Sequence, residues 1–431
     1  MRRTTRMAAL TGVIVSAIAL AGCSADDDPK TSGATAVSAD TQAEITYGIW
    51  DENQLPAIKQ NIEDFNEDYP GIKVTVDVTP WDQYWTKLQT QATSDTLPDV
   101  FWINGPNFQL YAANDQLEPV TGLVEAGDVD PANYPAALNE LYSLDGEQFG
   151  VPKDFDTIVL WYNKAILKEA GVAEPTADWT WEDFHDAART ISDKLGGEGI
   201  YGVAPWLTNG QSAYYNTILQ AGGEVISADG TKSGFDSPEA IKGLQLWADL
   251  IADGSSPTLQ QLSDTDALAY FQNGKAGLYW SGTWDVAPLA ESGVADDITT
   301  APLPHDERRA TVIHGLANVV SANSAEKAAA QAFQAYLGTE EAQLTQADMG
   351  AANPAFNGTQ DAFVESVPSF NLQTFLDAAD EYSFPYPVSK NTAVWTQLEA
   401  ELLPAAFSGE RPVADVAAEL AEKMNEALAE E

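Results

Sequence analysis

The chain has 431 residues, a length that exceeds what a single core usually needs and suits two α/β lobes. Its hydrophobic content of 44% is enough to bury a core in each lobe. It carries 65 acidic and 21 basic residues, so its formal net charge is −44. So acidic a protein is repelled by nucleic acid and by anionic lipid headgroups, which excludes both as partners. We interpret the acidity as a solubility feature of an exported protein rather than as a binding signal.

Residues 1–22 have the features of a signal peptide. Three arginines precede an apolar run, residues 7–20, that is too short to span a bilayer as a mature helix. The tetrad Leu20-Ala21-Gly22-Cys23 resembles a bacterial lipobox, which implies cleavage before Cys23 and diacylation of its sulfur; a plain signal peptide with a chance cysteine is the alternative. Cleavage would remove three arginines and no acidic residues, changing the net charge from −44 to −47.

Cys23 is the only cysteine, so its lipidation would leave no thiol for a disulfide, a catalytic nucleophile or a metal site. The segment that follows it, up to residue 43, is small, polar and without periodicity, which predicts a disordered tether. The sequence therefore predicts a domain on the outer face of the bacterial cytoplasmic membrane, attached through the lipid anchor only.

Strands and helices alternate at the start of the folded part. Residues 45–50, 72–78 and 100–103 are predicted strands, and residues 55–65 and 81–92 are predicted helices. This alternation predicts a parallel sheet, whose ligands bind beyond the carboxyl ends of the strands. Those ends carry Trp50-Asp51-Glu52-Asn53 and Asn104-Gly105-Pro106-Asn107.

The stretch 150–164 is predicted to be a crossover between the two lobes. Pro152 favours an extended entry, residues 157–162 form a predicted strand, and a helix opens at residue 163. Asp154 and Asp156 lie at the entry, which places a carboxylate where the lobes face each other.

The remaining elements follow in the same manner. Helices are predicted at 163–170, 181–195, 214–221, 237–253, 267–273, 325–337, 371–379, 394–402 and 413–430. Strands are predicted at 199–203, 276–280 and 313–320, with a second crossover at 298–304 and a third at 349–354.

In this order the elements resemble the extracellular solute-binding lipoproteins of bacterial ABC sugar importers, the family that includes maltose-binding protein. The resemblance covers essentially all of residues 44–430. It rests on the lipobox, Leu97-Pro98-Asp99-Val100-Phe101-Trp102, Gly150-Val151-Pro152 leading to Trp161-Tyr162-Asn163-Lys164, Phe271-Gln272-Asn273-Gly274-Lys275-Ala276 running into Ser281-Gly282-Thr283-Trp284, and Gly-Ala-Ala-Asn-Pro at 350–354. It implies an α/β, two-lobed, type II periplasmic-binding-protein-like fold with three crossings, an N-terminal lobe of 44–153 plus 302–348, and a C-terminal lobe of 154–301 plus 349–431.

A sugar offers C–H patches that stack on aromatic rings, and vicinal hydroxyls that pair with planar polar side chains. Aromatic and polar residues combine at four strand ends, namely Trp50-Asp51-Glu52-Asn53, Asn104 with Asn107, Trp206 with Asn209, and Trp284-Asp285. Trp81, Gly315 and Asn353 complete the set predicted from the sequence. The family resemblance adds Asp156 as a carboxylate in the cleft and Trp395 as an aromatic platform.

Other roles remain open for some of these residues. Glu52 and Asn53 can instead cap the helix that begins near residue 55, Trp81 can be a staple at a helix start, and Asn353 can belong to a turn. Among the other tryptophans, Trp85, Trp161, Trp181 and Trp247 are predicted to pack in element interiors, while Trp102 and Trp280 suit either role. The three histidines lack partners at metal-ligand spacing, which predicts no metal site.

The resemblance implies a monomeric binding protein, not an enzyme, that needs no cofactor, closes on its ligand and delivers it to the permease subunits of an ABC transporter. No arginine lies near the candidate loops, which argues against an acidic ligand, and platforms on both lobes favour an oligosaccharide. The sequence thus predicts a neutral oligosaccharide as the ligand. Two other functions are a glycoside hydrolase, which a pair of carboxylates would serve, and a static surface lectin.

Overall fold

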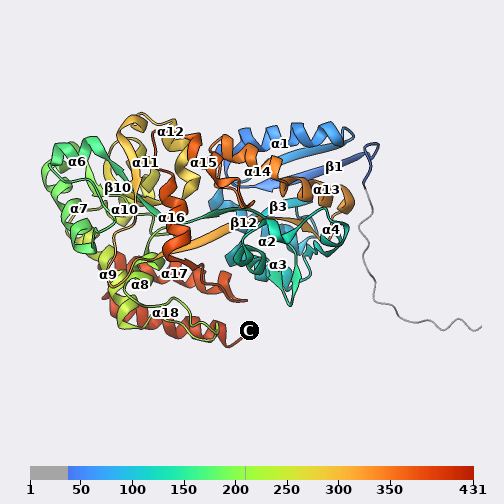
Figure 1. Cartoon of the computed structure of the whole chain (residues 1–431). Coiled ribbons are helices and arrows are strands. Elements are labelled where there is room, and N and C mark those ends of the chain that lie inside the picture. The colour runs from blue at the N-terminus through green and yellow to red at the C-terminus, as the bar shows by residue number, and fades with distance from the viewer. Residues whose placement is uncertain (1–36, 209) are drawn as a thin grey trace, which may run out of the picture. The chain divides into compact units, whose positions relative to one another are not determined.

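The computed structural model describes residues 37–208 and 210–431. Two sheets organise this part of the chain (Figure 1). The seven-stranded sheet consists of β1 (Ala43–Ile49), β2 (Ile72–Val78), β3 (Val100–Asn104), β4 (Leu117–Glu118), β7 (Val151–Asp156), β12 (Thr311–Ser321) and β13 (Ser383–Pro385). The four-stranded sheet consists of β8 (Val159–Asn163), β9 (Tyr201–Val203), β10 (Ala276–Ser281) and β11 (Ile298–Ala301). A small hairpin pairs β5 (Ser143–Leu144) with β6 (Glu147–Gln148).

The helices match most of the predicted ones within two or three residues at their starts. The longer ones are α1 (Leu55–Asp68), α2 (Trp81–Thr93), α3 (Gly105–Ala112), α6 (Lys164–Ala170), α7 (Trp181–Leu195), α8 (Tyr214–Gln220), α9 (Pro238–Ala252), α13 (Lys327–Leu337), α14 (Glu340–Asp348), α15 (Gln360–Ser366), α16 (Gln373–Tyr382), α17 (Thr392–Phe407) and α18 (Val413–Leu428). Shorter ones are α4 (Thr121–Ala126), α5 (Ala136–Leu141), α10 (Leu259–Asp264), α11 (Ala267–Gln272) and α12 (Val286–Ala290).

Local sequence explains where several helices begin. Thr180 and Asp183 form a reciprocal capping box at the start of α7, and Ser237 caps α9 ahead of Pro238. The tetrad 104–107 follows β3, as predicted for a strand end, and in addition it opens a helix, because α3 begins at Gly105. The Asn104 side chain accepts from the Asn107 amide, and Pro106 fits a first turn that needs no amide donor.

The seven-stranded sheet combines parallel and antiparallel strands. As predicted, β1 lies parallel to β2 and to β3. The long strand β12 then pairs antiparallel with β3, β4 and β7, and parallel with β13. Helices α1 and α13 pack on one face of this sheet and α2 and α3 on the other, so both faces are buried (Figure 1).

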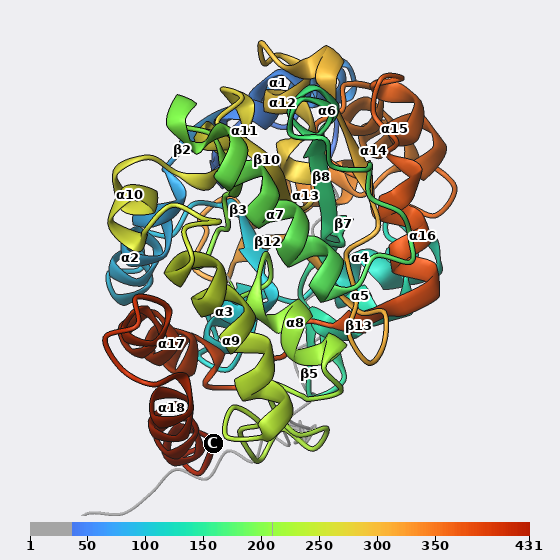
Figure 2. The same ribbon diagram turned by 90° about the vertical axis from the view of Figure 1, so that its left-hand side faces the viewer.

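The four-stranded sheet is covered on both faces as well. Along β8, Leu160 and Tyr162 point into a core with α6 to α9, α17 and α18, whereas Val159 and Trp161 point into a core with α11, α15 and α16. This alternation is the period of two that a strand imposes on its side chains. Figure 2 shows α7 and α9 in front of this sheet.

The predicted crossover differs from the observed one. Residues 151–156 are not merely extended but form β7, paired with β12, and β8 begins only at Val159. The chain therefore passes between the sheets at Thr157 and Ile158, where Ile158 N donates to Thr311 Oγ1 at 2.9 Å. Polar residues of β7, Lys153, Asp154 and Asp156, are buried, so the polar and apolar pattern of the sequence does not mark the break.

The other two predicted crossovers also make strand-like contacts. Residues 298–301 form β11, antiparallel to β8. Residues 349–354 lie against β7, where Phe155 N donates to Asn353 O at 3.2 Å and Asp154 forms a bridge with Pro354.

Candidate functional site

A cavity of about 370 Å³ lies between elements that flank the two sheets. Helices α2 and α3 form one wall, α17 and α8 with the loop before it form the other, and α17 contacts α3 directly (Figure 2). The lining residues are Trp81, Trp85, Thr86, Gln89, Asn104, Pro106, Asn107, Leu207, Thr208, Gly210, Gln211, Tyr214, Tyr215, His314, Tyr386, Ala393, Thr396, Gln397, Glu399, Ala400, Leu403 and Pro404. Its size and its mixture of rings with a few polar groups are typical of a small-ligand site.

The first wall presents two tryptophans one helical turn apart on α2. The ring centroids of Trp81 and Trp85 are 5.7 Å apart, and both rings pack against Trp50, at 5.4 and 5.6 Å. Tyr84 supports Trp50 and Trp85 from behind, with both centroid distances at 5.0 Å. Packing of this kind holds Trp81 and Trp85 in fixed orientations, as an aromatic platform requires.

Asn104 and Asn107 provide the polar groups of this wall. The Oδ1 atom of Asn104 accepts from both the amide and the side-chain Nδ2 of Asn107. Both side chains are buried and line the cavity. The capping of α3 therefore fixes the two amides that face the ligand space.

The opposite wall carries Glu399, whose side chain is 3% exposed. Tyr214 Oη donates to it at 2.6 Å and Tyr215 Oη at 2.9 Å. Burial raises the pKa of the Glu399 carboxyl to about 8, although both tyrosine hydrogen bonds favour the ionised form and act to lower it.

His314 and Tyr386 lie at the back of the same cavity. The rings of His314 and Tyr386 are 4.8 Å apart, and His314 Nε2 accepts from the Gly105 amide at 3.0 Å. Burial lowers the pKa of His314 to about 3, so the imidazole is neutral at physiological pH. Since a neutral ring accepting at Nε2 carries its proton at Nδ1, this hydrogen bond fixes the tautomer.

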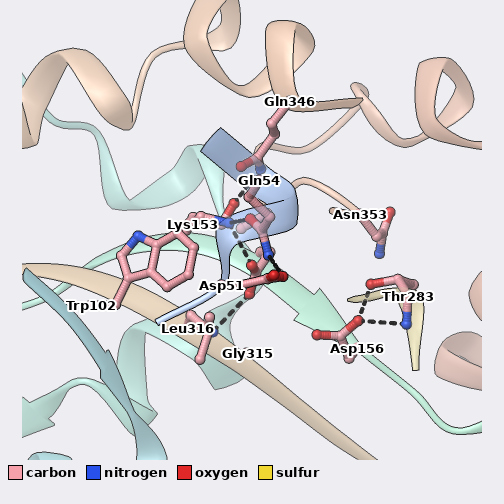
Figure 3. Close-up of polar contacts among 12 residues, drawn as sticks. Asp51, Gln54, Trp102, Lys153, Asp156, Thr283, Gly315, Leu316, Gln346 and Asn353 are labelled. Atoms are coloured by element: carbon pink, nitrogen blue, oxygen red, sulfur yellow. Dashed lines mark hydrogen bonds and ion pairs between the residues drawn. The ribbon is translucent and has the colours of Figure 1, made fainter. Parts of the chain in front are cut away.

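A second group of polar side chains, the β7 cluster, surrounds the strand that leads between the sheets (Figure 3). Lys153 Nζ donates to Asp154 Oδ2 at 2.8 Å and to Gln54 Oε1 at 2.7 Å, and lies 4.7 Å from the ring centroid of Trp102. Asp154 Oδ1 accepts from the Leu316 amide at 2.9 Å. Lys153 and Asp154 are almost fully buried, so each charge compensates the other.

Asp51 and Asp156 flank this cluster (Figure 3). Asp51 accepts from the Asn53 amide and from Gln54 Nε2, and burial raises its pKa. Asp156 accepts from the amide and the hydroxyl of Thr283, and its pKa is raised by burial first and by the charge of Asp154 second. Asp156 therefore ties β7 to the segment that follows β10.

Trp206, Trp284 and Asp285 form a third group. The rings of Trp206 and Trp284 meet edge to face at 6.4 Å. Asp285 is buried and accepts from Tyr279 and Ser281; burial raises its pKa to about 6, and the charge of Asp51 adds to the rise. This last contribution places Asp51 and Asp285, which come from different sheets, within electrostatic range of each other.

The predicted site residues thus lie in several different places in the structure. Trp81, Asn104 and Asn107 line the cavity, Trp50 supports its tryptophans, and Asp51 and Asp156 flank the β7 cluster. Glu52 and Asn53 are exposed in a short 3₁₀ helix, residues 52–54, that Asp51 caps. Cys23, the predicted signal peptide and Asn209 lie outside the described residues.

Three further predicted residues have structural partners. The carbonyl of Gly315, in β12, accepts from Tyr142 Oη, and Asn353 Nδ2 donates to Phe155 O at 3.1 Å. Trp395 is fully buried in the core, where its indole donates to Ser389 at 3.0 Å. A platform must present a ring face, so Trp395 does not serve as one in this geometry; its neighbours on α17, Thr396 and Glu399, line the cavity instead.

The lining residues that the sequence did not predict include Trp85, Tyr214, Tyr215, His314, Tyr386 and Glu399. Trp85 was assigned to helix packing, yet it lies four residues after Trp81 and so shares its helix face, a signal that was available. Glu399 lies in a predicted helix with no local feature to distinguish it from the many other acidic residues.

Comparison with known proteins identifies the family of this chain. The model of the bacterial extracellular solute-binding protein family matches residues 50–344. The chain belongs to this family. Its fold is accordingly the two-lobed α/β fold of such proteins, as predicted, with chain crossings between the lobes.

Individual relatives are more distant. The chain is 27% identical to a putative binding protein of Brucella abortus over 61% of its own length and 64% of the relative's. It is 26% identical to the diacetylchitobiose binding protein DasA of Streptomyces coelicolor, over 74% and 73% of the two chains. The match thus spans slightly less than two thirds of the Brucella relative.

Among solved structures, the chain resembles the ABC substrate-binding protein Lmo0181 of Listeria monocytogenes in complex with cycloalternan. The TM-score is 0.85 at 24% identity, covering 90% of this chain and 100% of that one. At this identity the likeness establishes the fold alone.

Two negative findings apply to residues 37–208 and 210–431. None of their helices combines the length and the apolar character needed to cross a bilayer. Within the same residues, no three His, Cys, Asp or Glu side chains converge in a way that could hold a metal ion.

Proposed function

We propose that this protein captures a neutral oligosaccharide in the cavity between α2, α3, α8 and α17 and delivers it to the membrane subunits of an ABC importer. The observation that carries the proposal is the opposition of two neighbouring indoles, Trp81 and Trp85, which meet edge to face, to polar groups on the far wall, Glu399 above all. Rings for C–H faces and acceptors for hydroxyls are the two features that sugar recognition requires.

The composition of the cavity supports a neutral ligand. Among its described lining residues none is Lys or Arg, so an acidic sugar or a phosphate would find no counter-charge. Two similar proteins, a diacetylchitobiose binding protein and a protein complexed with cycloalternan, are also named for uncharged oligosaccharides.

Lobe closure is part of the proposal. We divide the lobes at 44–153 plus 302–348 and 154–301 plus 349–431, although β7 stays paired with β12 through Asp156 and β13 joins the same sheet. A ligand that bonds both walls stabilises the closed arrangement, since only closure satisfies both sets of contacts. Small-angle scattering tests this: the radius of gyration should fall when a tightly bound sugar is added, and an unchanged value would exclude closure.

Attachment through a diacylated Cys23, a monomeric state and docking on a permease complete the proposal. Metabolic labelling with a fatty acid tests the anchor, because labelling should disappear in Cys23→Ala. Light scattering tests the monomeric state, and a concentration-independent mass of one chain is the expected result.

Calorimetry with a sugar panel tests the central point. We expect micromolar or tighter binding for at least one of maltotriose, cellotriose, arabinotriose, N,N′-diacetylchitobiose and cycloalternan, and no binding of galacturonic acid. Failure of every sugar to bind, or hydrolysis of a bound one, would overturn the proposal.

A further inference from the structure

Glu399 is the one acid among the described residues that line the cavity, and its position is unusual for a carboxylate. It is buried, it belongs to α17, and its two hydrogen-bond donors are Tyr214 and Tyr215 of α8. A buried carboxylate ordinarily has a cationic partner, as Asp154 has in Lys153. Glu399 has none among the residues that line the cavity.

The groups that face Glu399 leave it with acceptor capacity. Tyr214 and Tyr215 both donate to it, Tyr386 packs against Tyr215 with centroids 5.5 Å apart, and His314 behind them is neutral. An ionised carboxylate offers about four lone-pair sites, and two tyrosine hydroxyls do not fill them. Because Glu399 lines the cavity, a donor that enters the cavity can approach the remaining sites.

We propose that Glu399, held by Tyr214 and Tyr215, is the specificity-determining acceptor of this site and binds as a carboxylate to hydroxyl groups of an unacetylated, neutral sugar ring. The inference rests on the proposed function and adds the substrate class to it. A sugar ring with an acetamido group or a deoxy carbon at this position offers Glu399 no hydroxyl donor. The buried carboxylate then lacks a hydrogen bond, so such a ring binds more weakly.

Sugar binding by Glu399 is coupled to its protonation, whereas a role in packing alone is not. Because burial raises the pKa of Glu399 to about 8, most of the empty protein carries a protonated Glu399 at pH 7. A hydroxyl donor favours the ionised form, so binding releases the proton. Affinity should then rise with pH, by about tenfold per unit below about pH 7.5, and level off above the pKa of the empty site.

The experiment is isothermal titration of the full mature chain with whichever of maltotriose, cellotriose and arabinotriose binds most tightly, in buffers of different ionisation enthalpy. At pH 7 we expect the release of close to one proton per sugar. Glu399→Gln should bind about tenfold to hundredfold more weakly, with no proton release and a flat pH profile. Glu422→Gln, an exposed acid on α18, removes the same charge and should behave as wild type.

Tyr215→Phe provides a second readout if Glu399→Gln does not fold. Removing one donor destabilises the ionised carboxylate, so the rise of affinity with pH should move to higher pH. Sugar binding without proton release, with proton uptake, or with an unshifted profile in Tyr215→Phe overturns the role of Glu399 while leaving the proposed function intact. Absence of binding by every sugar overturns both.

Discussion

Two buried carboxylates, Asp154 and Glu399, show how differently one protein can treat the same chemical group. Asp154, in β7, is paired with the cation Lys153 and also accepts from the Leu316 amide. Glu399 has only two tyrosine hydroxyls and faces a cavity. The charge of Asp154 is thus compensated inside the protein, whereas Glu399 has only neutral partners among the cavity-lining residues and faces a space that a ligand can enter.

The largest expected effect comes from breaking the compensated pair. Lys153→Met leaves Asp154 buried without its counter-charge, and we expect the free energy of unfolding to fall by about 3–5 kcal/mol. Urea denaturation followed by tryptophan fluorescence measures it. A loss below about 1 kcal/mol would mean that the pair is not the structural element we describe.

The second largest effect is a loss of sugar affinity that should distinguish two aromatic sites. Trp85→Ala should weaken sugar binding about tenfold to hundredfold, since it removes a lining ring, as truncations of central aromatic contacts do. Trp206→Ala, which removes a ring outside the cavity lining, should change affinity less than threefold. If calorimetric titration showed the larger loss of affinity for Trp206→Ala, the sugar site would lie at Trp206 and Trp284 instead.

A smaller effect concerns pH. The pKa of Asp156 is raised in the folded protein, so between about pH 4 and that pKa the native state holds a proton that the unfolded chain has lost. Its contribution to stability therefore decreases as pH rises through this window. Asp156→Asn cannot titrate, and its melting temperature should fall less between pH 5 and 8 than that of wild type.

The matched control for this comparison is Asp186→Asn, an exposed acid on α7. It should keep the wild-type slope of melting temperature against pH. If Asp156→Asn and Asp186→Asn gave equal slopes, the general charge of the protein, and not the burial of Asp156, would set the pH dependence.

The smallest effect comes from an exposed ion pair. Lys73 lies 3.3 Å from Glu44, but both side chains are largely exposed, so solvent screens their attraction. Lys73→Met should change the free energy of unfolding by less than about 1 kcal/mol in the same urea titration. If Lys73→Met lowered the free energy of unfolding as much as Lys153→Met, burial would not explain the difference between the Lys73–Glu44 and Lys153–Asp154 pairs.

The sequence predicted the elements whose apolar residues repeat regularly. Leu55, Ile58, Ile62 and Phe65 identified α1, and Ile72, Val74 and Val76 identified β2. The break between β7 and β8 was missed because β7 itself contains the buried polar residues Lys153, Asp154 and Asp156, so polarity does not mark where the strand ends. The pairing of β12 with four strands depends on contacts distant in the chain, which local patterns do not encode.

The candidate site was predicted where strand ends carry aromatic or amide groups, as at Trp50 and Asn104, and at Trp81, where a helix starts. It was missed where helices contribute it. Glu399 resembles the other acidic residues of α17 and α18 in sequence, and only the approach of α8 distinguishes it. Trp395 is the opposite case. It was predicted to contact the ligand, but it is buried in the core although its sequence neighbour Thr396 lines the cavity.

The most direct test of the account is a crystal structure of the protein with the tightest-binding neutral sugar of the panel. We expect a sugar ring stacked on Trp81 or Trp85, with a hydroxyl within hydrogen-bond distance of Glu399. A sugar bound between Trp206 and Trp284, with Glu399 still contacted by its two tyrosines alone, would contradict it.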